Sequence, residues 1–563
     1  MRQLPWIIAF VVFAGAANVA AVAYVRGERT LYYWDQVNYW SKAADLAGMI
    51  RAGDAGGAVA RAVLSPRHDE YNSLPALPLA FVLAALGDSR LAFILGVVNL
   101  YVLPAAAAAM WLARRCSARP NAAGALALTM IALNPLFWSP VFLGYVDAGG
   151  MAILCAILAV SLRPPADDER RSAWWRRAIL LGFLLAAVVL FRRWYAYWVA
   201  CFGVVLLVDW LIAGKKRPRS AASIVALCIA AATASAVIFL VCGLSGIARF
   251  FVNHHDQYAA YRPPGGLGAS LLESFRASVF HQGWPLAALG VAGCLWAICN
   301  RSTRRSAIVL AATSLLVILP FSRIHPLGAA PHHFYLILLP LLLWPAVMIG
   351  ELIARRPVWG GILLAAATAY GTANLAAALT HRPPALPSSM LAEARFPPVV
   401  RSDLDQLIAM MRSIPAAQAG DNDIYVAASS KLLSASHLSL LNLSLNWRPS
   451  EKIPACRQVI HPGELDARDG FPEQLLRARY VIAATPSQYH VRPDHQTVVD
   501  VVARCFLDRR SVGRAFSQRG EPYHLSNGVT AILFERTRPI AEDDVQELRR
   551  LLHQAHPEVY PSP

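Results

Sequence analysis

Asp35 is the carboxylate of this chain that is best placed for chemistry, because it lies among aromatic residues just after the first apolar segment, residues 4–25. Its aromatic neighbours are Tyr32, Tyr33, Trp34, Tyr39 and Trp40. Tyrosine and tryptophan gather at the boundary between water and lipid. A carboxylate there can act as a general base toward an amphiphilic substrate, and it can equally be an ordinary interfacial residue. We take Asp35 as a candidate catalytic base.

Arg192 and Arg193 form a second candidate site, because they interrupt an apolar run between residues 178 and 213. The topology derived below places them on the outer face of a membrane, where basic residues are depleted. Arginine binds phosphate through paired hydrogen bonds. The pair therefore indicates a phosphate-binding site, and the alternative is a pair of solvated side chains.

The other polar candidates fall in segments on the same face. They are Asp69, Glu70, Asp147, His254, His255, Arg262, Arg323, His332, His333 and Tyr335. Glu70 with His255 and His254 could hold a divalent metal ion through carboxylate and imidazole ligands. Asp147 lies at the end of an apolar segment, where it either lines a cavity or caps a helix. The histidines and arginines can also be ordinary solvated loop residues.

The composition is that of a membrane protein. Of the 563 residues 56% are hydrophobic and 15% are charged, whereas soluble domains carry about 25% charged residues. Apolar segments that suit membrane helices recur through most of the chain. We expect spans over residues 4–25, 91–113, 122–141, 146–163, 178–191, 194–213, 221–245, 283–299, 306–321, 333–354 and 358–379.

The formal net charge of +17 does not indicate a nucleic-acid partner. The lysines and arginines gather in short loops between apolar segments, which is the pattern that sets membrane orientation. These loops contain residues 114–115, 170–177, 215–217, 304–305 and 355–356. We expect them on the cytoplasmic side and the candidate site residues on the opposite side.

Whether the segment 74–86 crosses the membrane decides on which side the later loops lie. It is too short to cross a membrane and contains Pro75 and Pro78, so we expect a helix that lies on or dips into the outer face. The resulting fold is an α-helical polytopic membrane protein with about 11 spans, in a range of about 10 to 13. The main outer loops are residues 26–90 and 246–282.

The region 383–563 has the pattern of a separate α/β domain that follows a membrane domain over residues 1–382. Apolar residues predict strands at 423–428, 479–484 and 529–534, and amphipathic periodicity predicts helices at 402–413 and 542–553. Cys456 and Cys505 could form a disulfide if this domain is periplasmic, but their spacing does not fix their geometry.

Four segments resemble motifs of the GT-C membrane glycosyltransferases, particularly the family 39 branch with the protein O-mannosyltransferases and the lipid A aminoarabinose transferase. They are residues 34–40, 70–92, 250–257 and 334–340. The first is similar to the family's first-loop aspartate motif, and it contains Asp35. In the third, His255 lies where the aminoarabinose transferase has a metal-binding histidine. Two departures are Gln36, in place of a second acid, and residues 71–73, in place of Lys-Pro-Pro.

The resemblance implies a glycosyltransferase of a bacterial inner membrane, with its active site and C-terminal domain on the periplasmic side. It would move a sugar from a polyprenyl-phosphate donor, such as undecaprenyl phosphate, to a lipid, glycan or protein acceptor by inverting displacement. The implied catalytic residues are Asp35 and Glu70. Asp35 would deprotonate the acceptor hydroxyl or orient an acceptor phosphate, and Tyr335 would line the donor cavity. The lipid phosphate would be held by Arg192 and Arg193, with Arg67, Arg262 and Arg323 as further candidates, and Glu70 and His255 would bind a metal ion or position the phosphate.

Two alternatives stay open. A lipid-linked glycan polymerase or ligase would tolerate Asp35→Asn but not the loss of arginines from residues 246–282. A transporter or scaffold would carry charged residues within its spans, and the sequence has few besides Asp147 and Asp209 near span ends.

Overall fold

The chain divides into two compact units, which we call the helical unit and the mixed unit. The helical unit contains Met1–Arg26 and Tyr39–Pro397, and the mixed unit contains Gly27–Asn38 and Pro398–Pro563. The sequence predicted a boundary between residues 382 and 383 and gave no sign that residues 27–38 belong with the C-terminal region. The computed structural model describes residues 4–28, 30–69, 71–162, 171–214, 220–251, 265–323, 327, 330–380, 386–393, 396, 401–415, 424–445, 451–460, 470–491 and 493–562.

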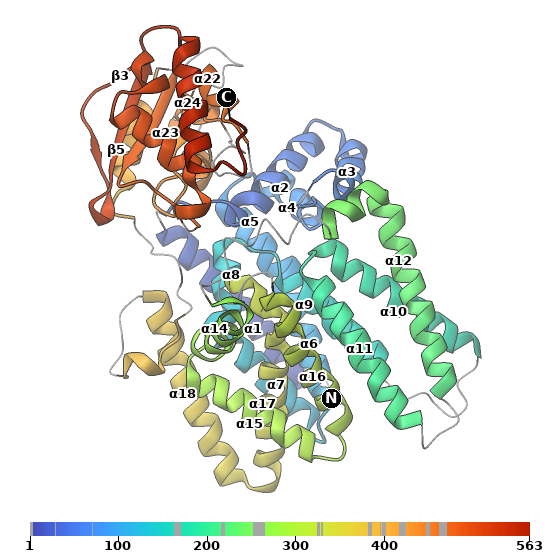
Figure 1. Ribbon diagram of the computed structural model, residues 1–563. Coiled ribbons are helices and arrows are strands. Elements are labelled where there is room, and N and C mark those ends of the chain that lie inside the picture. The colour runs from blue at the N-terminus through green and yellow to red at the C-terminus, as the bar shows by residue number, and fades with distance from the viewer. Residues whose placement is uncertain are drawn as a thin grey trace. The chain divides into compact units, whose positions relative to one another are not determined.

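The described residues of the helical unit fold into helices and their connections (Figure 1). The first part contains α1 (Leu4–Gly27), α2 (Asp35–Arg51), α3 (Ala55–Leu64), η1 (Ser65–Arg67), α4 (Ala76–Leu86), α5 (Arg90–Val97), η2 (Val98–Val102), α6 (Leu103–Arg115), α7 (Pro120–Ala132), α8 (Pro135–Leu143) and α9 (Ala148–Ser161). The second part contains α10 (Arg171–Phe191), α11 (Tyr195–Gly214), α12 (Ser220–Phe251), α14 (Gly266–Phe280), α15 (Trp284–Cys299), α16 (Arg304–Ser322), η5 (Pro331–Phe334), α17 (Tyr335–Arg355) and α18 (Pro357–Thr380).

The helix lengths confirm a polytopic membrane protein. Within the described residues seven helices are long and apolar enough to cross a membrane, or up to nine if each of two bent pairs counts as one span. One pair is α14 with α15, bent by 97°, and the other is α7 with α8, bent by 55°. The short segment predicted at residues 74–86 is the helix α4, which the tight turn at Gly87 ends.

The bend between α7 and α8 divides a segment that the sequence predicted as one span. Asn134 lies in the break and accepts a hydrogen bond from the Leu136 backbone N–H at 2.9 Å. Pro135 is the first residue of α8 and fixes the backbone there. A capping residue followed by proline starts a new helix, so the local sequence explains the break.

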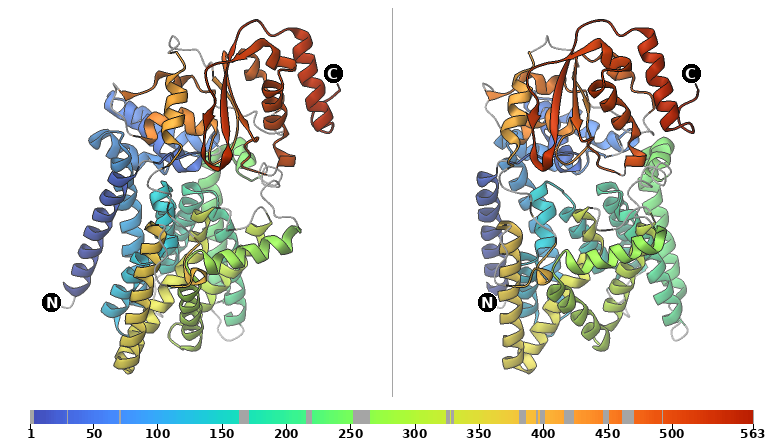
Figure 2. Two further views of the ribbon diagram at one scale, coloured as in Figure 1. Left: turned by 90° about the vertical axis from the view of Figure 1, so that its left-hand side faces the viewer. Right: turned by 60° about the vertical axis from the view of Figure 1, so that its left-hand side comes forward.

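The helices α10, α11 and α12 pack side by side (Figures 1 and 2, teal to green). α12 is kinked at Gly243, where the backbone has φ 66° and ψ 177°. Arg67 stabilises the turn before the kink, because its guanidinium donates hydrogen bonds to the carbonyls of Leu240 and Val241, both at 3.1 Å. Arg67 was a candidate for a donor phosphate, and the structure shows it engaged in this helix contact.

The mixed unit contains a sheet with strand order β1-β2-β5-β3, in which β4 also pairs with β5. The strands are β1 (Ile424–Ala427), β2 (Tyr480–Thr485), β3 (Phe516–Gln518), β4 (Tyr523–His524) and β5 (Thr530–Arg536). β1 and β2 are parallel, and β5 runs antiparallel to its neighbours. The three predicted strands are β1, β2 and β5, and the two predicted helices are α19 (Leu404–Arg412) and α24 (Glu542–Ala555).

Helices cover both faces of this sheet. On one face α19 and α20 (Ala435–Ser439) pack against alternate strand residues, and on the other α23 (Thr497–Leu507) and α24 pack against the remaining ones. Cys456 belongs to the first core and Cys505 to the second. Both thiols are buried and free, so the sheet separates them and the possible disulfide does not form.

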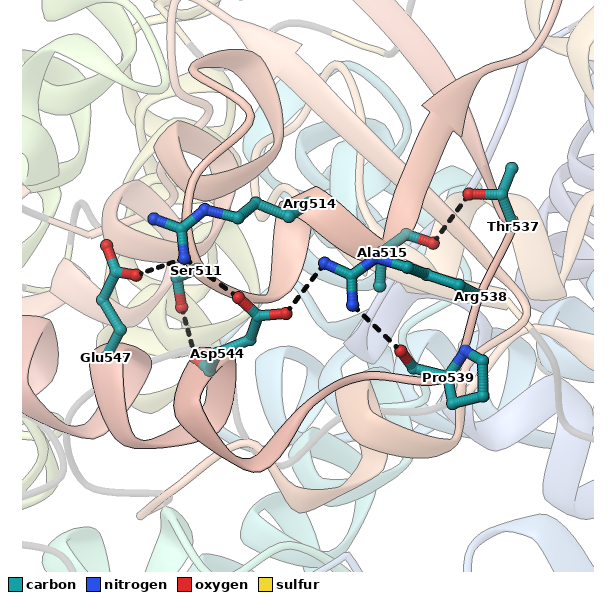
Figure 3. Close-up of polar contacts among 8 residues, drawn as sticks. All are labelled: Ser511, Arg514, Ala515, Thr537, Arg538, Pro539, Asp544 and Glu547. Atoms are coloured by element: carbon teal, nitrogen blue, oxygen red, sulfur yellow. Dashed lines mark hydrogen bonds and ion pairs between the residues drawn. The ribbon is translucent and has the colours of Figure 1, made fainter.

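Asp544 fixes α24 to the edge of the sheet (Figure 3). Its carboxylate accepts hydrogen bonds from Arg514 at 3.0 Å and Arg538 at 3.1 Å. Its backbone carbonyl accepts a hydrogen bond from the Ser511 hydroxyl at 2.6 Å. An acidic residue in the first turn of a helix also interacts favourably with the helix dipole. This cluster is therefore part of the framework of the mixed unit.

Candidate functional site

A buried ion pair between Arg192 and Asp147 forms the centre of the candidate site. Arg192 directly follows α10, and Asp147 directly precedes α9. The Arg192 Nε lies 3.1 Å from the Asp147 Oδ1, and the two side chains are 2% and 3% exposed. Asp147 occupies the capping position of α9, but its side chain makes no capping hydrogen bond. Of the two interpretations of Asp147, the structure therefore excludes simple helix capping.

Tyr39, in the second turn of α2, is a further partner of Arg192. The Arg192 Nη1 donates a hydrogen bond to the Tyr39 hydroxyl at 2.7 Å. The guanidinium carbon lies 5.0 Å from the centre of the Tyr39 ring. Asp35 is the first residue of the same helix, so one turn of α2 separates the candidate base from a direct partner of Arg192.

Tyr195 fixes the backbone of Asp147. It is the first residue of α11, and its hydroxyl donates a hydrogen bond to the Asp147 carbonyl at 2.8 Å. Gly150 permits this approach, because a Cβ atom at this position would lie 2.2 Å from the Tyr195 Cε2. Asp147 is thus held through its carbonyl by Tyr195 and through its carboxylate by Arg192.

Arg193 is buried beside Arg192 and contacts two aromatic rings. Its guanidinium carbon lies 5.0 Å from the centre of the Tyr71 ring and 4.7 Å from that of Trp194. Tyr71 also contacts Arg192, at 5.8 Å. Guanidinium groups are attracted to aromatic faces, and more strongly where water is excluded. The break between α10 and α11 therefore places two adjacent, buried and well-packed arginines at one location.

His332 and His333 lie in the same buried region. The ring of His332 stacks on Tyr145, with centroids 4.1 Å apart and an interplanar angle of 20°. His333 packs edge-on against Trp194 at 4.9 Å. The two imidazole centroids are 4.1 Å apart. Both histidines are thus packed among aromatic rings rather than solvated.

Tyr335, at the start of α17, lies in the same buried region. Its hydroxyl donates a hydrogen bond to the Phe137 carbonyl at 2.5 Å, and it interacts electrostatically with Asp147. The structure therefore brings together these predicted site residues: Asp147, Arg192, Arg193, His332, His333 and Tyr335.

Asp35 belongs to the mixed unit, together with the rest of the segment Gly27–Asn38. It opens α2 and is partly exposed. The turn that leads into the helix is closed by a hydrogen bond from the Gln36 N–H to the Tyr33 carbonyl at 3.0 Å. Asp35 thus lies at the N-terminus of a helix that follows the first apolar segment.

The remaining predicted residues lie elsewhere or outside the described residues. Asp69 is partly exposed and forms an ion pair with Lys42 of α2 at 2.8 Å. Arg323 is exposed directly after α16. Glu70, His254, His255 and Arg262 lie outside the described residues.

The described residues give no support for a metal site. Among them, no group of three histidine, cysteine, aspartate or glutamate side chains could hold a metal ion. The predicted metal ligands are Glu70 and His255, and the structure describes neither residue. The metal site stays a prediction.

Three tyrosines of the site were missed as functional candidates: Tyr39, Tyr71 and Tyr195. Tyr39 and Tyr195 lie in aromatic runs of the sequence and Tyr71 in a polar loop, and aromatic residues near a membrane surface are too common to single one out. The available signal was the opposite charge of Asp147 and Arg192, each at the end of an apolar segment on the same predicted face. A charge pair of this kind must be neutralised when it is buried.

The arrangement is suited to an anionic group that carries a hydrophobic chain. Two guanidinium groups offer planar sets of donors that match phosphate oxygens. The partners Asp147, Tyr39 and Tyr71 fix the direction of those donors, and preorganised donors lose little freedom when a ligand binds. The surrounding helices are apolar, as a lipid-linked ligand requires.

Several solved structures are similar to this chain, although no protein-family model and no curated protein sequence matches it. ArnT from Cupriavidus metallidurans bound to undecaprenyl phosphate has a TM-score of 0.54 and 14% identity, over 95% of this chain and 99% of that one. Its apo form has a TM-score of 0.53 and 14% identity, over 95% and 98%. The archaeal oligosaccharyltransferase AglB from Archaeoglobus fulgidus, with an inhibitory peptide and dolichol phosphate, has a TM-score of 0.47 and 11% identity, over 85% and 69%.

Proposed function

We propose that this chain, which has the GT-C fold of the membrane glycosyltransferases, transfers a sugar from a polyprenyl-phosphate donor to an acceptor at the membrane surface. The observation that carries the proposal is the buried arginine pair Arg192–Arg193, held by Asp147, Tyr39 and Tyr71. The similarity to ArnT, whose structure contains undecaprenyl phosphate, supports a lipid phosphate as the ligand of these arginines.

The proposed reaction is a direct displacement at the anomeric carbon. The acceptor oxygen attacks this carbon as the bond to the donor phosphate breaks, so the configuration inverts and polyprenyl phosphate leaves. Asp35 takes the acceptor proton as general base. Arg192 and Arg193 stabilise the negative charge that develops on the departing phosphate. No step of this scheme requires a metal ion, and Glu70 with His255 stays the proposed ligand pair for one.

The finer features of the proposal concern location and substrates. The active site and the C-terminal region lie on the periplasmic side of a bacterial inner membrane, and undecaprenyl phosphate carries the sugar. The acceptor is an envelope lipid, glycan or protein. The positive-inside distribution of the basic loops supports this orientation.

The test is a transfer assay with the purified protein and radiolabelled undecaprenyl-phosphate sugars. Asp35→Asn should lower kcat by roughly 100-fold or more, because general-base catalysis contributes about 10²–10⁴. Arg193→Gln should raise the KM for the donor. The matched control is Arg305→Gln, because Arg305 pairs with Asp209 on the surface and should leave the rate unchanged. Full turnover by Asp35→Asn would contradict the mechanism and favour a glycan polymerase or ligase.

A further inference from the structure

The segment that precedes Asp35 is an integral part of the mixed unit. Leu31 is 3% exposed and packs in the same core as Ile424 of β1 and Ile482 of β2. The next residues, Tyr33 and Trp34, contact two histidines from the C-terminal region. A short piece of the first outer loop is thus built into the α/β domain near the end of the chain.

Trp34 has an unusual backbone conformation directly before Asp35. Its φ is 46°, and a bulky residue with positive φ is held there only by its surroundings. Its carbonyl accepts hydrogen bonds from the Val37 and Asn38 N–H groups, both at 3.1 Å. The turn at Trp34 therefore leads directly into α2, and it sets the direction in which the Asp35 side chain extends from the backbone.

His490 contacts the Trp34 ring. The two ring centroids are 4.7 Å apart. The His490 Nδ1 lies 2.6 Å from the Ser429 Oγ and 2.9 Å from the Gln496 Nε2, and its backbone N–H donates a hydrogen bond to the Gln496 Oε1 at 2.8 Å. These contacts fix the imidazole, and through it the indole of Trp34.

His437 contacts Tyr33 in a similar way. The ring centroids are 4.5 Å apart, and the His437 Nδ1 lies 2.9 Å from the Ser434 Oγ. Burial, with a smaller effect of the Arg401 charge, lowers the pKa of His437 well below its usual value. The imidazole is therefore neutral, and it packs against Tyr33 as an aromatic ring.

The contact of His490 with Trp34 lies at one edge of the sheet. Ser429 follows the end of β1, and Gln488 and His490 follow the end of β2. Because β1 and β2 are parallel, these residues meet, and the Ser429 N–H donates a hydrogen bond to the Gln488 carbonyl at 2.9 Å. The carboxyl edge of parallel strands is where α/β domains commonly bind ligands. Here Trp34 contacts His490 at that edge.

We propose that His437 and His490 are positioning residues for Asp35, which they orient through Tyr33 and Trp34. The proposal rests on the proposed function, because it takes Asp35 as the catalytic base. Neither histidine needs to touch a substrate. Their role is to stabilise the turn from which the Asp35 side chain extends.

The kinetic test compares His490→Ala with His490→Phe, which keeps a ring against Trp34. His490→Ala should lower kcat roughly 10- to 100-fold, since small displacements of a catalytic group have effects of this size, and His490→Phe should recover part of the loss. The KM for the lipid donor should change little. In the Asp35→Asn background His490→Ala should have no further effect. An equal loss in both backgrounds would overturn the proposal.

The structural test uses hydrogen exchange of the full-length protein, which requires no activity. His490→Ala should raise exchange in peptides that cover residues 30–40, and the control His524→Ala, an exposed histidine of β4, should not. Unchanged exchange would overturn the positioning proposal. Raised exchange in a protein that transfers no sugar from polyprenyl phosphate would support the contact and refute the proposed function separately.

Discussion

Arg192 and Asp147 are 45 residues apart in the sequence and form an ion pair that is buried on both sides. The pair joins the end of α10 to the start of α9 and also reaches α2 through Tyr39. It therefore connects three helices at the point where the candidate phosphate-binding arginines lie. Its integrity should govern both the stability and the activity of the protein.

Asp147→Asn should destabilise the protein by about 3 kcal/mol, because removing one partner leaves the other charge buried without its counterion. Arg192→Gln should have a similar effect for the same reason. The double variant should lose less stability than the sum of the two single losses. Unfolding midpoints in detergent, measured for all four proteins, provide the test. If the two single losses of stability add up to the loss in the double variant, the two side chains do not stabilise each other.

Gly150→Ala should displace Tyr195, because the new Cβ would lie 2.2 Å from its ring. Overpacking of this kind typically costs about 1–3 kcal/mol, and the hydrogen bond to the Asp147 carbonyl should be lost with it. The control is Gly203→Ala in α11, where no atom lies within 4 Å of a new Cβ. That change should be neutral or slightly stabilising, because alanine favours helix. Thermal unfolding of both variants checks the contrast.

Cys456 and Cys505 should stay reduced and unreactive in the folded protein. Burial raises the pKa of Cys456 to about 12 and that of Cys505 to about 11, and the thiolate is the reactive form. Mass spectrometry after brief iodoacetamide treatment should find both unmodified, and both should react after unfolding. A disulfide-linked peptide containing both residues would contradict the structure.

Glu535 should stabilise β5 in a manner that depends on pH. Burial raises the pKa of Glu535, but the hydrogen bond and charge of Arg519 lower it more, so the net pKa is below its usual value. Such a carboxyl stabilises the fold above its unfolded pKa, about 4.3, and this contribution is lost as pH falls through the folded value. Glu535→Gln should therefore weaken exchange protection of residues 530–536 at pH 7, with a difference that shrinks in acid. Glu521→Gln, at an exposed position, is the control.

The elements of the fold were largely predictable, because each depends on a local pattern. The strands β2 and β5 coincide with apolar runs of the sequence, and α24 coincides with a clear amphipathic repeat. The break at Asn134 was also encoded locally, by asparagine followed by proline, but the apolar character of its flanks concealed it. Hydropathy measures whether a segment prefers lipid and does not report where its helix bends.

The site was predictable only in part, because its contacts join distant parts of the chain. Asp147, Arg192 and Arg193 could be identified from charge in an apolar context. The partner Tyr39 is 153 residues from Arg192, and no local pattern specifies which of many aromatic residues accepts that hydrogen bond. The contact of Trp34 with His490 was hidden for the same reason.

The inclusion of Gly27–Asn38 in the mixed unit has a consequence for biosynthesis. During translation this segment leaves the ribosome long before residues 398–563, so Leu31, Tyr33 and Trp34 lack their C-terminal partners until the last part of the chain is made. A nascent or truncated chain can insert its helices while the turn before Asp35 is still unformed. Completion of the C-terminus would then act as a final maturation step, and premature termination would leave the turn before Asp35 without its contacts to the C-terminal region.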